Sequence, residues 1–191
     1  MRRGDPIAFG EDFPALLAAA RVGSEQALSS LYRELHPKIL RYLRAQEPAE
    51  AEDLASEVWM DVAAGLGRFR GDDLDFRRWT FTIARRRLID LRRSKARRPV
   101  ESRSAGSMPD SGLIGDVEAE AMENLSTQAA LARIATLPAD QAEVVLLRIL
   151  AGVSVRDVAA IVGKRPGTVR VLQHRALQRL AATMSRDPVT H

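Results

Sequence analysis

The sequence predicts an all-α protein made of two small helical domains joined by a flexible linker, the second domain containing a helix-turn-helix. Valine, leucine and isoleucine recur mostly at three- and four-residue spacing, which is the period of helices and not of strands. Residues 94–115 are rich in Ser, Gly, Pro and Arg and have little apolar content to fold around. The 191 residues, 46% of them hydrophobic, suffice for one ordinary core or two small ones.

Four helices are expected in the first half of the chain. A short helix should follow Asp12 as its N-cap and end near Gly23. The next should begin after Ser24 and meet Pro37 as a possible kink. Its expected apolar stripe consists of Leu28, Leu31, Tyr32, Leu35, Ile39, Tyr42 and Leu43.

The third helix, over about 49–66, carries two stripes. One is apolar and consists of Leu54, Val58, Val62 and Leu66; the other is acidic and consists of Asp53, Glu57 and Asp61. Glycines and the GDD of residues 71–73 then predict a loop, followed by a fourth helix over about 75–93. The core stripe expected for it is Phe76, Trp79 and Ile83, with Leu88 and Leu91.

Beyond the linker, helical patterns cover about 117–136, 138–150, 155–162 and 166–184. The last two are joined by a very short turn, the spacing of a helix-turn-helix, with Ser154 as an expected N-cap and Gly163 suited to a left-handed exit. The seam expected to be buried in the final helix is Val169, Leu172, Ala176 and Leu180. The outward face is then Arg165, Gly167, Thr168, Arg170, Val171, His174 and Arg175.

These patterns give five segments. We expect an N-terminal tail at 1–13, a first domain at 14–95, the linker at 96–116, a second domain at 117–185 and a C-terminal tail at 186–191.

Charge is unevenly distributed, although the formal net charge is only +4. Residues 47–61 hold six carboxylates and no Lys or Arg, whereas residues 77–98 hold ten basic residues and one acid. Residues 164–186 contain no acid at all. A charge run can be no more than a solvated helix face, but blocks of opposite sign indicate different partner surfaces.

Several classes of function are not supported by the residues present. The chain has no cysteine, which excludes disulfides and thiolate sites and fits a reducing cytoplasm. We find no signal-peptide pattern and no long uncharged apolar run, so no membrane insertion is expected. The three histidines are dispersed, and no phosphate-binding loop or nucleophile motif occurs. We therefore expect no catalysis, no metal and no cofactor.

Two cationic helices suit nucleic acid. The final helix fits the major groove, where arginine can bond guanine edges and phosphates. The sequence FRRWTFTIARRRLIDLRR of residues 76–93 places aromatic residues among arginines, a composition suited to single strands. Its aromatics are at helical spacing, however, so core packing is the other interpretation for Phe76 and Trp79. For the final helix, the alternative is a helical hairpin with a basic solvent face.

Two passages in this order resemble the extracytoplasmic-function sigma factors of bacterial RNA polymerase. The first is EDLASEVWMDV with FRGDDLDFRRWTFTIARRRLIDLRR, and the second is LPADQAEVVLLRILAGVSVRDVAAIVGKRPGTVR. The resemblance spans about residues 15–184. It implies a promoter-specificity factor for core RNA polymerase, which contacts the clamp helices of the largest subunit and the flap region. An anti-sigma factor is a further implied partner.

The resemblance also implies roles for individual residues. It implies core-polymerase contacts at Asp53, Leu54, Glu57, Val58 and Asp61. It implies minus-ten DNA contacts at Arg70, Gly71, Asp72, Asp73, Trp79, Arg85 and Arg86. It implies minus-thirty-five contacts at Arg165, Gly167, Thr168, Arg170, Val171, His174 and Arg175. The chain departs from the family pattern at Thr80, Arg86 and residues 171–173, so the base preferences of relatives are not transferred.

Two other functions remain open on the residues alone. A conventional helix-turn-helix regulator of duplex operators would explain the second half of the chain but not the first. A sigma mimic that titrates a regulator would need neither the arginine excess nor a DNA-reading helix.

Overall fold

The structure is a computed structural model that describes residues 9, 12–97 and 127–184, and all regular structure in these residues is helical. The elements in chain order are α1 (Phe13–Arg21), α2 (Glu25–Arg44), the 3₁₀ turn η1 (Pro48–Glu50), α3 (Ala51–Leu66), α4 (Asp73–Arg97), a helix over 127–135, α6 (Ala139–Leu146), the π-helical turn η2 (Leu147–Ala151), α7 (Val155–Val162) and α8 (Pro166–Met184). The all-α prediction is confirmed. Most of the predicted linker lies outside the described residues, as does the part of the 117–136 pattern before residue 127.

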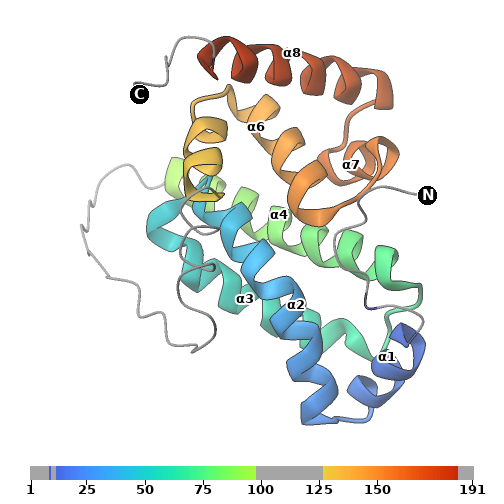
Figure 1. The fold of residues 1–191 in the computed structure, drawn as a ribbon. Coiled ribbons are helices and arrows are strands. Elements are labelled where there is room, and N and C mark those ends of the chain that lie inside the picture. The colour runs from blue at the N-terminus through green and yellow to red at the C-terminus, as the bar shows by residue number, and fades with distance from the viewer. Residues whose placement is uncertain (1–8, 10–11, 98–126, 185–191) are drawn as a thin grey trace, which may run out of the picture.

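Helices α1 to α4 form the first domain, as Figure 1 shows. Their buried apolar residues belong to one core cluster, which continues into the second domain. Helix α2 begins where the sequence predicts, because the Ser24 side chain accepts a hydrogen bond from the Ala27 amide at 3.4 Å. It runs through Pro37 without a break. Asp12 holds the N-cap position of α1, but its side chain makes no capping bond. Phe69 and Phe76 lie edge to face at 5.4 Å and close the end of the core near α1.

The apolar stripe of α2 is narrower than predicted. Leu31, Leu35, Ile39, Tyr42 and Leu43 are buried, whereas Leu28 and Tyr32 are 36% and 42% exposed. These two residues lie at the edge of the stripe, where α3 reaches α2 only in part. The predicted core stripe of α3 is confirmed, since Leu54, Val58, Val62 and Leu66 are all buried.

Helix α4 begins two residues earlier than predicted because the loop before it supplies a cap. The Asp75 amide donates to the Asp72 carboxylate at 2.8 Å, and the Asp75 carboxylate accepts from the Asp72 amide at 3.4 Å. This reciprocal pair satisfies amides that would otherwise lack partners at the helix start. The helix then continues to Arg97, beyond the predicted end near 93.

The second domain contains the predicted helix-turn-helix. Ser154 and Asp157 form a capping box at the start of α7, and Gly163 leaves that helix with φ 67°. Helix α8 starts at Pro166, and its buried residues Val169 and Ala176 face α6 and α7. The pattern predicted as one helix over 138–150 is divided into α6 and the π-helical η2, after which Gly152 takes φ 65°.

The two domains pack against each other along α4. Turn η2 contacts both α2 and α4, and α7 contacts α4. In Figure 1, α4 accordingly lies between the helices of the first domain and the C-terminal group. Every residue from 141 to 147 is buried, because this segment faces α8 on one side and the first domain on the other.

Candidate nucleic-acid and protein interfaces

The carboxylates of the predicted acidic stripe form an acidic ridge on α3, and they differ in how exposed they are and in how many arginines they bond. The ridge consists of Asp53, Glu57 and Asp61. Asp53 is exposed and forms no ion pair with any described residue. Glu57 accepts one bond from Arg87 at 3.2 Å, and its side chain is 45% exposed. Asp61 accepts from Arg87 through both oxygens, at 2.6 and 2.7 Å, and from Arg86 at 3.2 Å. The acidic ridge is therefore open at its N-terminal end and tied to α4 at the other.

The pKa of Asp61 lies below its ordinary value of 3.8, chiefly because Arg87 hydrogen-bonds the carboxylate, with a further contribution from the charge of Arg86. A carboxylate with a depressed folded-state pKa adds stability that is present above the unfolded-state pKa and is lost as pH falls through the folded-state pKa. The bond between α3 and α4 should therefore hold at neutral pH and break only in strong acid.

We expect Asp61→Asn to lower the free energy of unfolding by about 1 kcal/mol at pH 7, a fall in Tm of roughly 2–4 °C. The difference from the unmodified protein should shrink once pH falls below about 3.8. Thermal unfolding followed by circular dichroism from pH 7 to pH 2.5 measures this. Asp53→Asn on the same helix is the matched control and should change Tm little at any pH.

Leu54 and Val58 were also expected to contact the polymerase, but both side chains are buried in the core of the first domain, at 4% and 0% exposure. Their position on the apolar stripe explains this, because that stripe faces α2 and α4. In this conformation they support the ridge from beneath and are not surface contacts.

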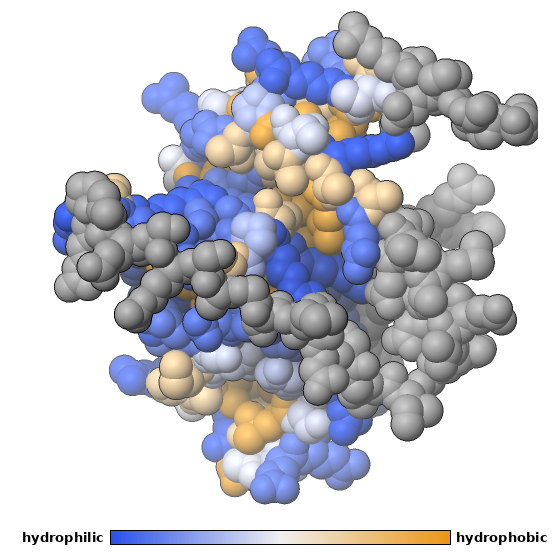
Figure 2. Space-filling view, turned by 90° about the vertical axis from the view of Figure 1, so that its left-hand side faces the viewer, coloured by the Kyte–Doolittle hydropathy of each residue, from blue (hydrophilic) through white to orange (hydrophobic). Residues whose placement is uncertain are grey.

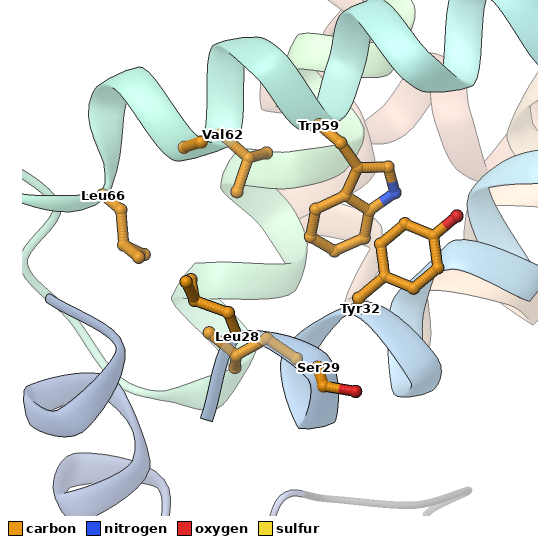
Figure 3. Close-up of a pocket in the computed structure, with 8 residues that line it drawn as sticks. Leu28, Ser29, Tyr32, Trp59, Val62 and Leu66 are labelled. Carbon is orange, nitrogen blue, oxygen red and sulfur yellow. The ribbon is translucent and has the colours of Figure 1, made fainter. Parts of the chain in front are cut away.

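A shallow apolar groove of about 390 Å³ lies on the other flank of α3, between it and α2. Leu28, Tyr32 and Trp59 line it, and the Tyr32 and Trp59 rings lie 4.9 Å apart (Figure 3). The groove explains why Leu28 and Tyr32 of the predicted stripe are not fully buried.

The loop residues predicted to contact DNA hold the start of α4. Gly71 has φ 145°, and a side chain there would meet Asp75, with a Cβ only 2.6 Å from the Asp75 Cβ. Asp72 caps the helix, and Asp73 accepts from Arg77 at 2.7 Å. Arg70 is exposed, and its guanidinium donates to the carbonyls of Gly67 and Phe69.

Trp79 is half-buried and lies over Gly65. A Cβ at Gly65 would be 2.6 Å from the Trp79 ring, so any larger residue there would displace the indole. The ring stacks on Phe69 at 5.1 Å and is 5.8 Å from Phe76. Thr80, one of the departures from the family pattern, is fully buried and donates to the Phe76 carbonyl at 2.8 Å. Its side chain is therefore not available to a base in this conformation.

Arg85 and Arg86 point to different partners. Arg85 donates to Glu143 of α6 at 2.9 and 3.5 Å, a contact between the two domains. Arg86 donates to Asp61, and its side chain remains 65% exposed. Arg86, at which the chain departs from the family pattern, therefore has a carboxylate partner, Asp61, on the neighbouring helix α3.

The predicted reading face of α8 is open to solvent along its whole length. All seven of its residues are exposed, including the apolar Val171 at 48%. Lys164, just before α8, bonds Asp140 at 3.0 Å, and no ion pair of the seven is found with the described residues. The positive charge of this face is thus not neutralised within the described part of the chain.

Glu143 and Arg78 form contacts between distant segments that the sequence patterns did not predict. Glu143 is 8% exposed and also lies 3.3 Å from the Tyr42 hydroxyl, which donates to it. Arg78 bonds Asp157 of α7 at 3.3 Å. An acid within a run of buried residues was the one available signal, since a charge is seldom fully buried without a partner.

Figure 2 shows hydrophilic side chains over the middle of one face, with hydrophobic areas above and below.

Among the described residues, no group of three or more His, Cys, Asp or Glu side chains is placed to hold a metal ion. None of the described helices is long and apolar enough to cross a membrane.

Comparison with known proteins assigns both halves of the chain. The family model for sigma-70 region 2 matches residues 31–98, and that for sigma-70 region 4 matches residues 127–180. The chain is 37% identical over 181 residues to the ECF RNA polymerase sigma factor ShbA of Streptomyces griseus, covering 88% of this chain and 93% of the relative. The chain belongs to the ECF sigma factors of bacterial RNA polymerase. It is thus a promoter-directing initiation factor, and the conventional-regulator alternative is not supported.

Two further comparisons agree with this assignment. The sigma factor is 33% identical over 180 residues to the ECF RNA polymerase sigma factor SigD of Mycobacterium tuberculosis, covering 90% of this chain and 83% of the relative. Among solved structures, it is similar to the sigma factor RpoE of Bartonella quintana, determined in complex with the anti-sigma factor NepR. That likeness has a TM-score of 0.61 and 25% identity, and covers 84% of this chain and 98% of the other.

Proposed function

We propose that this sigma factor binds core RNA polymerase through the open end of its acidic ridge, melts the minus-ten element along α4 and reads the minus-thirty-five element with α8. The observation that carries the proposal is the segregation of charge. Asp53 on α3 and the cationic face of α8 are exposed, and neither forms an ion pair with another residue in the described ranges.

The ridge suits a basic protein surface. Asp53 and Glu57 are the carboxylates that remain accessible, whereas Asp61 is held by two arginines. We therefore assign the polymerase contact to Asp53 and Glu57, with Leu54 and Val58 as core residues that fix the helix. Asp61 joins α3 to α4. Complementary charge of this kind mainly raises the association rate and selects the partner.

For the minus-ten element, the proposal uses the arginines of α4 and the loop before it. Arg70 and Arg86 are exposed, and each would exchange its present hydrogen bonds, to backbone carbonyls for Arg70 and to Asp61 for Arg86, for bonds to a phosphate. Gly71, Asp72 and Asp73 shape the loop, and Trp79 fixes it against α3 through Gly65. Strand separation then needs no hydrolysis, because extruded bases are held by stacking and pocket contacts that offset a cost of a few kcal/mol.

For the minus-thirty-five element, the geometry supports major-groove readout by the N-terminal half of α8. Arg165, Thr168 and Arg170 precede or occupy its first turns, which is the end that a recognition helix presents to base edges. His174 and Arg175 follow one turn later and suit phosphates or flanking bases.

We propose that the sigma factor acts without catalysis or cofactor, in the cytoplasm, where bacterial polymerase and its template are found. An anti-sigma factor is a proposed partner, because the RpoE structure is a complex with one. Such a partner would cover the ridge or the DNA-binding faces.

In vitro transcription from a promoter library with purified core polymerase tests the proposal. The sigma factor should add specific start sites that core polymerase alone does not use. Association with core polymerase that gives no start site, or no association at low salt, would count against it.

A further inference from the structure

The loop between α3 and α4 is held from outside by Arg21, the last residue of α1. The Arg21 guanidinium donates to the Leu66 carbonyl at 3.4 Å and also to the Phe69 carbonyl. These acceptors are 45 and 48 residues away along the chain, and α1 lies beside the loop in Figure 1. Arg21 thus joins α1, to which the proposed function gives no role, to the loop that is proposed to contact the minus-ten element.

The bond to Leu66 completes the C-terminal end of α3. The last carbonyls of a helix have no partner within the helix, and a cation is favourable beside them. The last turn of α3 contains no basic residue, and Leu66 is its final residue. Arg21 therefore supplies from α1 the cation that α3 does not itself carry.

The bond to Phe69 holds the middle of the loop. The Phe69 side chain is buried, with its ring stacked on Trp79 and edge to face with Phe76. Its carbonyl accepts from two guanidiniums, that of Arg21 and that of Arg70, the second at 2.7 Å. The loop is therefore fixed at Phe69 by its ring on one side and by its carbonyl on the other.

The two donors to this carbonyl differ in their other tasks. Arg70 is exposed, and the proposed function turns it from the carbonyl to a phosphate. Its other acceptor, the carbonyl of Gly67, is on an exposed residue where water can replace the guanidinium. Phe69 is buried, and a buried carbonyl that loses its donors is costly. With Arg21 in place, Arg70 can leave while the Phe69 carbonyl keeps a donor.

We propose that Arg21 is a positioning residue for minus-ten recognition, which holds the Phe69 carbonyl and thereby frees Arg70 to bond a phosphate of the captured strand. The inference rests on the proposed minus-ten role of the loop. Without Arg21, Arg70 is the guanidinium that remains on the Phe69 carbonyl, so it is retained by the loop and withdrawn from DNA.

The test uses the holoenzyme and a fluorescent single-stranded oligonucleotide that the holoenzyme selects from a random pool. Arg21→Met keeps the apolar stem and removes the donors, so it should raise the Kd for this strand about tenfold. Arg21→Lys keeps a cationic donor and should raise it by less than about threefold. Arg33→Met makes the same substitution at an exposed position of α2 and should leave the Kd within about twofold.

A double variant separates positioning from a loss of stability or a separate DNA contact. Arg70→Ala should raise the Kd about tenfold in the unmodified chain but less than about twofold in Arg21→Met, where Arg70 is already withdrawn. Two independent contacts would instead multiply to about a hundredfold. Circular dichroism checks that each variant is folded, and the Kd of Arg21→Met for core polymerase should equal that of the unmodified chain.

Losses that multiply in the double variant would overturn the inference. So would an unchanged Kd in Arg21→Met, an equal loss in Arg33→Met, or a loss in Arg21→Lys as large as that in Arg21→Met. Failure of the proposed function is distinguishable, because Arg70→Ala would then leave strand binding unaltered in the unmodified chain. That result would overturn the proposed minus-ten contact of Arg70 together with this inference, whereas multiplied losses overturn the inference alone.

Discussion

Replacing Asp53 and Glu57 together with lysine is expected to abolish binding to core RNA polymerase. Both residues lie on the accessible part of the acidic ridge. Reversing two charges against a complementary surface turns attraction into repulsion, which costs several kcal/mol across an interface. A loss of about 3 kcal/mol or more corresponds to at least a hundredfold rise in Kd. Fluorescence anisotropy with labelled sigma factor and unlabelled core polymerase measures it.

The matched control reverses the charges of Glu25 and Asp140, which are exposed in the first turns of α2 and α6 and away from the ridge. This pair makes the same change in net charge and the same unfavourable placement of lysine near a helix N-terminus. It should leave the Kd for core polymerase within about threefold, since distant charges are screened at physiological salt. Equal weakening by both variants, or normal affinity of Asp53→Lys/Glu57→Lys, would rule out the ridge as the docking site.

Much of the fold was predictable because its signals are local. Ser24 and Ser154 bond amides three residues away, so a cap can be read from a few residues. Gly163 occupies a left-handed position that its place between two helical patterns already required. The bounds of α7 and α8 agree with the prediction for the same reason.

The start of α4 shows what local sequence signals do not predict. The GDD of residues 71–73 predicts a loop. The Asp72 carboxylate, however, accepts a hydrogen bond from the Asp75 amide, so the end of that loop forms the first turn of the helix. A turn residue and a capping residue are often the same type, and the sequence pattern does not distinguish them.

Contacts between distant segments were not predictable. Arg85 and Glu143 are 58 residues apart, and periodicity tells which face of a helix is apolar but not which other helix it meets. The same limit applies to Asp61, whose ion pairs with Arg86 and Arg87 depend on how α3 packs on α4. The acidic stripe was identified correctly as a pattern, but its division into free and bound carboxylates required the structure.

Leu28 and Tyr32 illustrate a further limit. Both fall on the apolar side of α2, yet they line an open groove because α3 covers that side incompletely. A hydrophobic stripe gives the direction of the core but not its width.

The second large effect is expected from Arg170→Ala in the recognition helix. Arg170 is exposed on α8, beside Val171 and within two turns of Pro166. If it bonds a base edge in the minus-thirty-five element, its loss should cost about 1–3 kcal/mol, roughly a 5- to 150-fold rise in Kd for duplex DNA bound by the holoenzyme. Preference at one base position should also relax. Selection from a randomised minus-thirty-five library, followed by Kd measurements on the selected duplex, gives both values.

Arg179→Ala is the matched control, because it removes the same charge from an exposed site on the same helix, next to Leu137 and away from the turn. It should leave base preference unchanged and raise Kd by less than about threefold. The salt dependence separates the two ways in which Arg170 can act. A base contact leaves the slope of log Kd against log salt nearly unaltered, whereas a phosphate contact lowers it by about one and weakens all sequences alike. A library profile identical to that of the unmodified protein would show that Arg170 does not read a base.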